Sequence, residues 1–192
     1  MDTKSMMIVG VGGQGTLLAS KLLGRLLLTR GYDVKVSEVH GMSQRGGSVV
    51  TYVRWGDAVR SPIIDRGRAD LILSFELLEA ARYTEYLKPE GVIVTNLQRV
   101  NPMPVITGAA EYPAAPEEAI RAQGLRLQTV DALPLAEQAG SSKAVNLVLM
   151  GYVSRFFDFT REEWLTAMEQ SVPAKFLELN RRAFLLGCEA GQ

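Results

Sequence analysis

The chain has 192 residues, of which 47% are apolar and 22% are charged, so it is long enough for one soluble domain with a proper core. Lysine plus arginine equals aspartate plus glutamate at 21 each, which argues against nucleic-acid and membrane-surface partners and gives little protection against self-association. The single cysteine, Cys188, excludes an intrachain disulfide and cannot hold an iron–sulfur cluster or a structural zinc by itself.

The amino terminus has no signal-peptide pattern, since the first residues lead straight into an apolar strand. The most apolar helix that we expect, at residues 17–28, carries Lys21 and Arg25 and is too short to cross a bilayer. We therefore expect a cytoplasmic protein in a reducing compartment.

A glycine turn follows the first apolar strand and opens the first helix, and its sequence over residues 10–15 is Gly-Val-Gly-Gly-Gln-Gly. The spacing of Gly10, Gly12 and Gly15 matches the dinucleotide-binding fingerprint. Unpaired N–H groups at the start of the helix attract an anion, and Gln14 adds amide groups at the tip of the turn. A tight turn made only for packing, with Gly12 admitting a neighbouring backbone, is the alternative.

Hydrophobic patterning predicts strands that alternate with helices along the first two thirds of the chain. Strands are expected at residues 6–9, 33–39, 49–55, 69–75, 92–95 and 125–130, and helices at residues 17–28, 76–87 and 116–122, with a turn at residues 89–91. The section that contains Pro102, Pro104, Pro113 and Pro116 is expected to wrap one edge of the sheet.

Helices are expected to end the chain, at residues 143–157, from a capping box at residues 160–163, and at residues 174–186. Phe156, Phe157, Phe159 and Trp164 in this part are either core or partner surface. The sequence therefore predicts one Rossmann-like α/β domain over residues 1–192, with a mostly parallel sheet flanked by helices and a helical C-terminal cap at about residues 141–188.

A second glycine segment follows the second strand, where Arg45 precedes Gly46 and Gly47. Its position predicts the carboxyl edge of the sheet, where α/β proteins place their sites. An arginine beside glycines can meet a flat or anionic group with its whole guanidinium fork, although a surface arginine next to a flexible turn has the same pattern.

Three polar residues outside the glycine segments are also candidates for a functional or structural role. Glu38 lies about 20 residues beyond Gly15, where a dinucleotide-binding fold places the acid for the ribose hydroxyls. His40, the only histidine, is expected to make a loop hydrogen bond rather than to act as an acid or base. Asn146 lies in an otherwise apolar helix, and if it is buried the first glycine segment is a candidate partner.

Taken together, the two glycine segments are similar to those of one family. Residues 10–15, Glu38, residues 40–41, residues 44–47 and Arg54 resemble the gamma-type subunit of 2-oxoacid:ferredoxin oxidoreductases. The sequence of residues 38–49 looks most like that of the small (beta) subunit of indolepyruvate ferredoxin oxidoreductase. Asn96, Asn146, Gly151 and Gly187 also fit this resemblance.

The resemblance implies an enzyme subunit that has no catalytic residue and no metal site of its own. Such enzymes oxidatively decarboxylate a 2-oxoacid with thiamine diphosphate and Mg²⁺, pass electrons through iron–sulfur clusters to ferredoxin, and release an acyl-coenzyme A. The large (alpha) subunit is expected to hold the thiamine and the clusters, with coenzyme A as co-substrate, and the isolated small chain is expected to form a homodimer if its vacant surface self-associates.

Two hypotheses describe the glycine segments. In the first they accept an anion, such as a coenzyme A phosphate; in the second they dock on the large subunit, which we favour because the chain supplies no base, nucleophile or metal. The residues concerned are Gly12, Gly13, Gln14, Gly15, Thr16, Arg45, Gly46 and Gly47. The alternatives for the whole chain are a gamma subunit acting with another 2-oxoacid (pyruvate, 2-ketoisovalerate or 2-oxoglutarate) and an NAD(P)-binding Rossmann protein.

Overall fold

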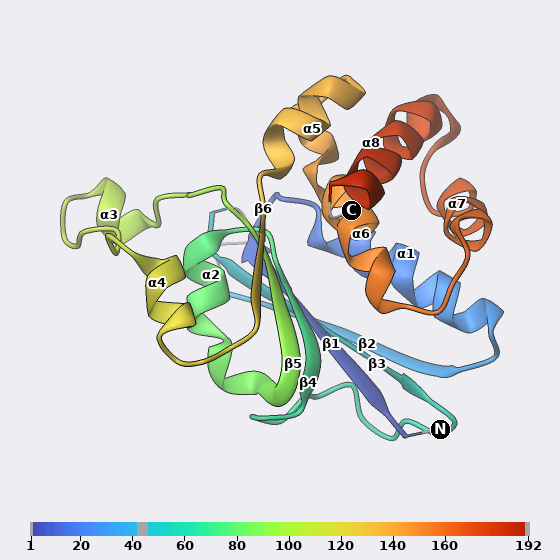
Figure 1. Cartoon of the computed structure of the whole chain (residues 1–192), viewed down its shortest axis with the longest axis horizontal. Helices are drawn as coiled ribbons and strands as arrows, with labels where there is room; N and C mark the ends of the chain where they lie inside the picture. The colour runs from blue at the N-terminus through green and yellow to red at the C-terminus, as the bar shows by residue number, and fades with distance from the viewer. Residues whose placement is uncertain (1, 42–45, 191–192) are drawn as a thin grey trace.

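A six-stranded sheet forms the centre of the computed structural model, which describes residues 2–41 and 46–190 (Figure 1). The strand order is β2-β3-β1-β4-β5-β6, where β1, β4, β5 and β6 are parallel and β3 is antiparallel to both β1 and β2. The strands are β1 (Lys4–Val11), β2 (Asp33–His40), β3 (Ser48–Gly56), β4 (Ala69–Ser74), β5 (Leu87–Asn96) and β6 (Leu127–Val130). The expected α/β fold with a mostly parallel sheet is confirmed.

Helices cover both faces of this sheet (Figure 1). One face carries α1 (Thr16–Thr29), α5 (Ala132–Ala139), α6 (Val145–Val153), α7 (Arg161–Glu169) and α8 (Leu177–Glu189), and the other carries α2 (Leu77–Arg82) and α4 (Pro116–Arg121). The short helix α3 (Met103–Ile106) and the 3₁₀ turns η1 (Thr84–Tyr86), η2 (Ser142–Ala144), η3 (Ser154–Phe156) and η4 (Ala174–Phe176) complete the elements.

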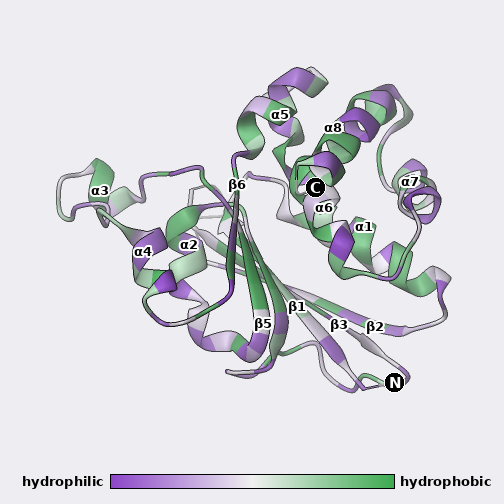
Figure 2. Cartoon of the chain, in the orientation of Figure 1, coloured by the Kyte–Doolittle hydropathy of each residue, from purple (hydrophilic) through white to green (hydrophobic). Residues whose placement is uncertain are grey.

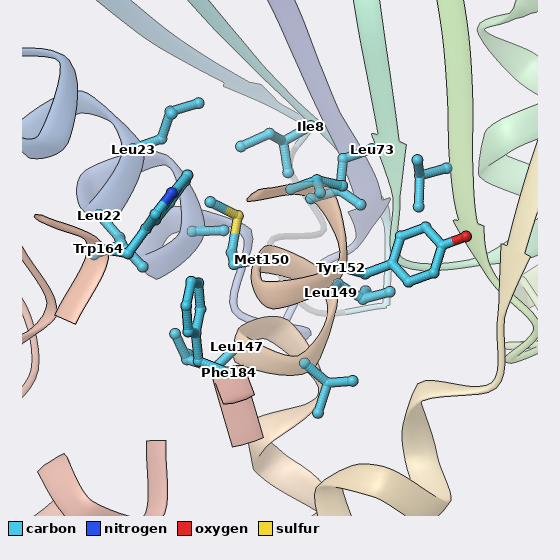
Figure 3. Close-up of a cluster of buried hydrophobic side chains, with 14 of the residues drawn as sticks. Ile8, Leu22, Leu23, Leu73, Leu147, Leu149, Met150, Tyr152, Trp164 and Phe184 are labelled. Atoms are coloured by element: carbon cyan, nitrogen blue, oxygen red, sulfur yellow. The ribbon is translucent and has the colours of Figure 1, made fainter. Parts of the chain in front are cut away.

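Alternation along β1 divides the core into two layers, because successive side chains of a strand point to opposite faces. Met6 and Ile8 join the larger cluster under α1 and α6, whereas Met7 and Val9 join the smaller cluster under α2 and α4. Figure 2 shows hydrophobic residues along the central strands, and the residues of α6 are all buried. The larger cluster includes the fully buried Trp164, so this aromatic residue belongs to the core (Figure 3).

Two glycines let α6 and α8 cross at backbone contact. A Cβ atom on Gly151 would lie 1.9 Å from the carbonyl oxygen of Phe184, and one on Gly187 would lie 1.9 Å from the carbonyl oxygen of Val148. No side chain fits at either of these two positions, so the two helices pack closely where they cross.

The structure differs from the predicted bounds of helices and turns as follows. The helix predicted at residues 76–87 ends at Arg82, because Leu87 is already paired with Ala69 as the first residue of β5. The turn predicted at residues 89–91 lies inside β5, where an irregularity in the pairing with β4 accommodates it. Helix α5 was not predicted, although Pro134 is compatible with its first turn, where the backbone N–H has no partner within the helix.

The proline-rich section also differs from expectation. Residues 97–115 leave the carboxyl end of β5 and project away from the sheet, with α3 at the far end, instead of following the sheet edge (Figure 1). The chain then returns through α4, which packs against α2, and enters β6 at the edge.

Candidate functional site

The two glycine segments are joined to each other at the carboxyl end of β1. The backbone N–H of Gly12 donates to the carbonyl oxygen of Gly47 at 2.8 Å, and the N–H of Gly46 donates to the carbonyl oxygen of Gly12 at 3.2 Å. These bonds continue the antiparallel β1–β3 ladder, whose last pair is Val11 with Ser48. Gly12 thus admits a neighbouring backbone, and that backbone is the second glycine segment.

The first segment then turns into α1 through two left-handed residues. Gly13 has φ +103° and Gly15 has φ +90°, backbone angles that residues other than glycine rarely adopt. Gly15 is the N-cap residue of α1, and within the described part of the chain no side chain caps this helix and its first turn has no acidic residue. The positive end of the helix, with Thr16 as its first residue, therefore receives no counter-charge from its own cap or first turn.

The amide of Gln14 points into the fold. Its Oε1 accepts from the N–H of Val11 at 2.7 Å, while its Nε2 donates to the carbonyl oxygen of Phe75 at 3.2 Å and to Oε1 of Gln98 at 3.3 Å. The Oε1 and Nε2 atoms of Gln14 therefore hold the turn together and join it to the residues that follow β4 and β5.

Asn96 extends this connection to the start of α5. It is fully buried, its Nδ2 donates to the same carbonyl of Phe75 at 3.3 Å, and its Oδ1 accepts from the N–H of Ala132 at 3.2 Å. Gln98 was missed by the sequence analysis, and its place two residues after the strand-ending Asn96 was the one available signal. The amides together hold the glycine turn in place before anything binds.

Asn146 confirms the expectation that a buried amide of α6 meets the glycine turn. Its side chain is 5% exposed, and its Nδ2 donates to the carbonyl oxygen of Gly15 at 3.4 Å. A Cβ atom on Gly15 would lie 2.5 Å from that nitrogen. Only glycine leaves room for this contact, so the helical C-terminal region and the first glycine segment fit each other.

Two hollows flank the first glycine segment. One, of about 320 Å³, brings Glu38 and His40 beside the turn, and its lining is Gly12, Gly13, Gly15, Thr16, Leu17, Glu38, His40 and Val49. The other, of about 490 Å³, lies towards α5 and α6, and its lining is Gly13, Gln14, Gly15, Gln98, Leu133, Ser142, Lys143 and Val145. Both open at the carboxyl edge of the parallel strands, the edge at which such sheets bind ligands.

The position of Glu38 bears on the dinucleotide alternative. Glu38 lies on β2, and β3 separates β2 from β1, so the acid is about 10 Å, or two strand spacings, from β1. In the dinucleotide-binding order the corresponding strand lies directly beside β1. The carboxylate Oε2 of Glu38 accepts from the Thr51 hydroxyl at 3.4 Å, and Nδ1 of His40 lies 3.3 Å from the carbonyl oxygen of Gly41.

A third hollow, of about 290 Å³, lies beside the second glycine segment. Its lining includes Gly46, Gly47 and Ser48 on one side and Pro102, Met103 and Pro104 on the other. The Ser48 hydroxyl donates to Glu79 Oε2 at 2.5 Å, and burial raises the pKa of this carboxyl group, which was not singled out from the sequence. Arg45 lies outside the described residues.

A hollow of about 420 Å³ opens at the opposite, amino end of the sheet and is unrelated to the glycine segments. Two of its charged groups are engaged within the protein: Asp70 accepts from Lys88 at 2.7 Å and from the N–H of Ser5 at 2.8 Å. Arg30 forms a forked ion pair with Glu163 at 2.8 and 2.9 Å. These contacts engage Asp70, Lys88 and Arg30 within the fold, and the hollow is remote from the glycine segments, so we place the candidate site at the carboxyl edge.

Metal ligands do not gather in the part of the chain that the structure describes, because no three His, Cys, Asp or Glu side chains there lie close enough to hold an ion. The described helices also include none that is long and apolar enough to cross a membrane.

Comparison with known proteins places this arrangement in a family. The model of the pyruvate ferredoxin/flavodoxin oxidoreductase family matches residues 5–190. The indolepyruvate oxidoreductase subunit IorB of Thermococcus kodakarensis is 43% identical over 100% of this chain and 98% of its own length, and that of Archaeoglobus fulgidus is 36% identical over 95% and 92%.

Solved structures of low identity share the fold. The gamma subunit of a keto/oxoacid ferredoxin oxidoreductase from Geobacter sulfurreducens superposes with a TM-score of 0.72 at 22% identity, covering 97% of both chains. The 2-oxoglutarate:ferredoxin oxidoreductase from Magnetococcus marinus has a TM-score of 0.73 at 16% identity, where 99% of this chain matches 31% of a longer one. Because the family model matches nearly its whole length, the chain belongs to the pyruvate ferredoxin/flavodoxin oxidoreductase family.

Proposed function

We propose that the chain is the small (beta) subunit of an indolepyruvate:ferredoxin oxidoreductase. The observation that carries this proposal is the joined pair of glycine segments in a chain 43% identical, over its full length, to a protein named as subunit IorB of indolepyruvate oxidoreductase. The enzyme converts aryl 2-oxoacids to acyl-coenzyme A and passes electrons to ferredoxin, and this chain supports that reaction without being active alone.

The large (alpha) subunit binds thiamine diphosphate, Mg²⁺ and the iron–sulfur clusters in this proposal. The donor set of this chain supports that division, since Cys188 is the single cysteine and the described side chains form no group of three metal-ligating residues. Iron–sulfur clusters need several cysteine thiolates, so the cluster ligands come from the partner.

The joined glycine segments form the docking face for the large subunit. Gln14 turns both of its amide groups inward, and Gly12, Gly46 and Gly47 carry no side chain, so a partner backbone can approach closely. Arg45 pairs with a carboxylate of the partner. In the alternative role, the uncapped start of α1 at residues 13–16 accepts a phosphate of coenzyme A.

A pull-down of the tagged chain from its native cell extract tests the proposed function. We expect a large, cysteine-rich partner and coenzyme-A-dependent reduction of a viologen dye with indolepyruvate. Faster reduction with pyruvate, 2-ketoisovalerate or 2-oxoglutarate would assign the chain to another enzyme of the family. Recovery of the chain alone, with NAD binding in the hollow that contains Glu38, would overturn the subunit assignment.

The two roles of the glycine segments are separated by a second experiment. Under docking, Arg45→Ala weakens co-purification of the large subunit, and titration of the isolated chain with coenzyme A releases no heat. The matched control is Arg60→Ala, which removes an exposed arginine from the loop after β3. Binding of coenzyme A to the isolated chain, with co-purification unchanged by Arg45→Ala, would establish the anion site instead.

A further inference from the structure

Residues 97–115 form a projecting arm whose tip is apolar (Figure 1, Figure 2). Met103 and Ile106 are the first and last residues of α3 and are 63% and 64% exposed. Residues three apart lie on one side of a helix, so the two side chains present one small apolar surface. The charged residues of the arm are Arg99 and Glu111, which lie towards its two ends and not at the tip.

A buried carboxylate joins the two segments at the base of the arm. Glu76, which is 1% exposed, accepts on Oε1 from the N–H of Val100 at 3.1 Å and from the hydroxyl of Tyr112 at 2.5 Å. Val100 is on the outgoing segment and Tyr112 on the returning one, so one carboxylate oxygen holds the two segments together. The arm therefore leaves the domain in a set direction.

The tip is also ordered by its own backbone. The N–H groups of Val105 and Ile106 donate to the carbonyl oxygen of Pro102 at 2.9 and 3.1 Å, and the N–H of Ala110 donates to Pro104 at 3.0 Å. Both prolines have a fixed φ angle. A surface that is already ordered loses little conformational entropy when it binds, which favours a binding role over a loose connection.

The arm is continuous with the proposed docking face. Pro102, Met103 and Pro104 line the same hollow as Gly46 and Gly47 of the second glycine segment. The fold itself occurs within a longer chain in the Magnetococcus marinus protein, where it accounts for 31% of the length. Because the start of α3 and the second glycine segment line one hollow, a partner that covers the glycine segments also contacts the start of α3.

We propose that the large subunit of the same enzyme covers this arm and receives Met103 and Ile106 in an apolar recess. This inference rests on the proposed function, because it names a second contact of the same docking face. The absence of charge at the tip sets the chemistry of the partner surface, which is apolar where it meets α3. The glycine segments supply close backbone approach, and the arm supplies the apolar anchor.

Polar substitutions of similar or smaller size test whether the apolar character of the arm is needed. The double variant Met103→Gln, Ile106→Thr is compared with Leu28→Gln, which changes an equally exposed leucine (60%) in the last turn of α1, at the opposite end of the sheet. Binding to purified large subunit is measured by titration for the wild type and both variants. We expect the dissociation constant to rise about tenfold or more for the double variant and not for the control, with melting temperatures unchanged.

Each other outcome has one meaning. Equal binding by wild type and double variant would overturn the role of the arm and leave the proposed function standing. Failure of the wild type to bind any large subunit would overturn both. A wild-type dimer that the double variant abolishes, with binding to the large subunit retained, would assign the tip to a second copy of this chain and overturn the inference.

Discussion

Asn146 occupies the space beside Gly15 that a side chain on that residue would need. The donor Nδ2 of Asn146 lies 3.4 Å from the carbonyl oxygen of Gly15, and a Cβ atom on Gly15 would lie 2.5 Å from the same nitrogen. Because the two residues are separated by most of the chain, their fit links the C-terminal helices to the first glycine segment.

Alanine at position 15 is expected to destabilise the protein more than alanine at position 13. Both glycines have positive φ angles, of +90° and +103°, which cost roughly 1 kcal/mol for alanine. Only Gly15→Ala also displaces Asn146, since nothing lies within 4 Å of a Cβ on Gly13. Urea unfolding should give losses of about 3 kcal/mol for Gly15→Ala and about 1 kcal/mol for Gly13→Ala. Equal losses would contradict the role of Asn146.

Gly151→Ala is expected to separate α6 from α8. The added carbon would lie 1.9 Å from the carbonyl oxygen of Phe184, and backbone cannot yield as a flexible side chain does. Thermal unfolding should report a loss of about 3 kcal/mol or more. The control is Gly24→Ala in α1, whose nearest neighbour would be Val36 Cγ2 at 3.7 Å, and it should stabilise by about 0.5–1 kcal/mol. A mild effect at position 151 would mean that the helices pack less closely than described.

The ion pair between Arg30 and Glu163 is expected to make stability depend on acid pH. The hydrogen bond from Arg30, followed by that from the Thr160 backbone, lowers the pKa of Glu163 from its ordinary value of 4.5 to about 2. A lowered folded-state pKa stabilises the folded form above the unfolded value and loses that effect as pH falls through the folded value. Glu163→Gln should thus be less stable than the wild type near pH 7, and the difference should decrease as the pH falls from 4.5 towards 2.

The control for this prediction is the partner residue. Arg30→Gln removes the largest cause of the lowered Glu163 pKa. The loss of stability on acidification, measured by thermal unfolding, should therefore be smaller in this variant than in the wild type. Added salt should weaken the effect in the wild type, because the pair lies at the surface. A difference between wild type and Glu163→Gln that is as large at pH 2 as at pH 7 would contradict the assignment.

Tyr112→Phe is expected to loosen the arm and leave the sheet intact. The variant removes the hydroxyl that donates to Glu76 at 2.5 Å, while the N–H of Val100 still donates to the same oxygen. Amide hydrogens of α3 should exchange several-fold faster, and global stability should fall by about 1 to 2 kcal/mol. Tyr86→Phe, which changes a tyrosine in η1, is the matched control and should leave exchange in α3 unchanged.

The central parallel strands and the first helix could be predicted because their residues carry local signals. The buried run at residues 69–74, the glycine turn before Thr16 and the capping box of Thr160 with Glu163 all appear where the sequence places them. The predicted bounds of α2 and β5 were wrong, because pairing with β4 overrides the helical pattern near Leu87. The expectation for Asn146 was confirmed, since a buried amide must find a partner.

The sequence by itself determined the fold class, the position of both glycine segments and the family that they indicate. It did so because glycine spacing and hydrophobic period are properties of neighbouring residues. Only the tertiary structure decided that the Gln14 amide points inward, that β3 separates Glu38 from β1, and that Glu76 fastens both segments of the projecting arm. Those contacts join residues 14 and 75, or 76 and 112, and such pairings arise when the sheet and its connections assemble.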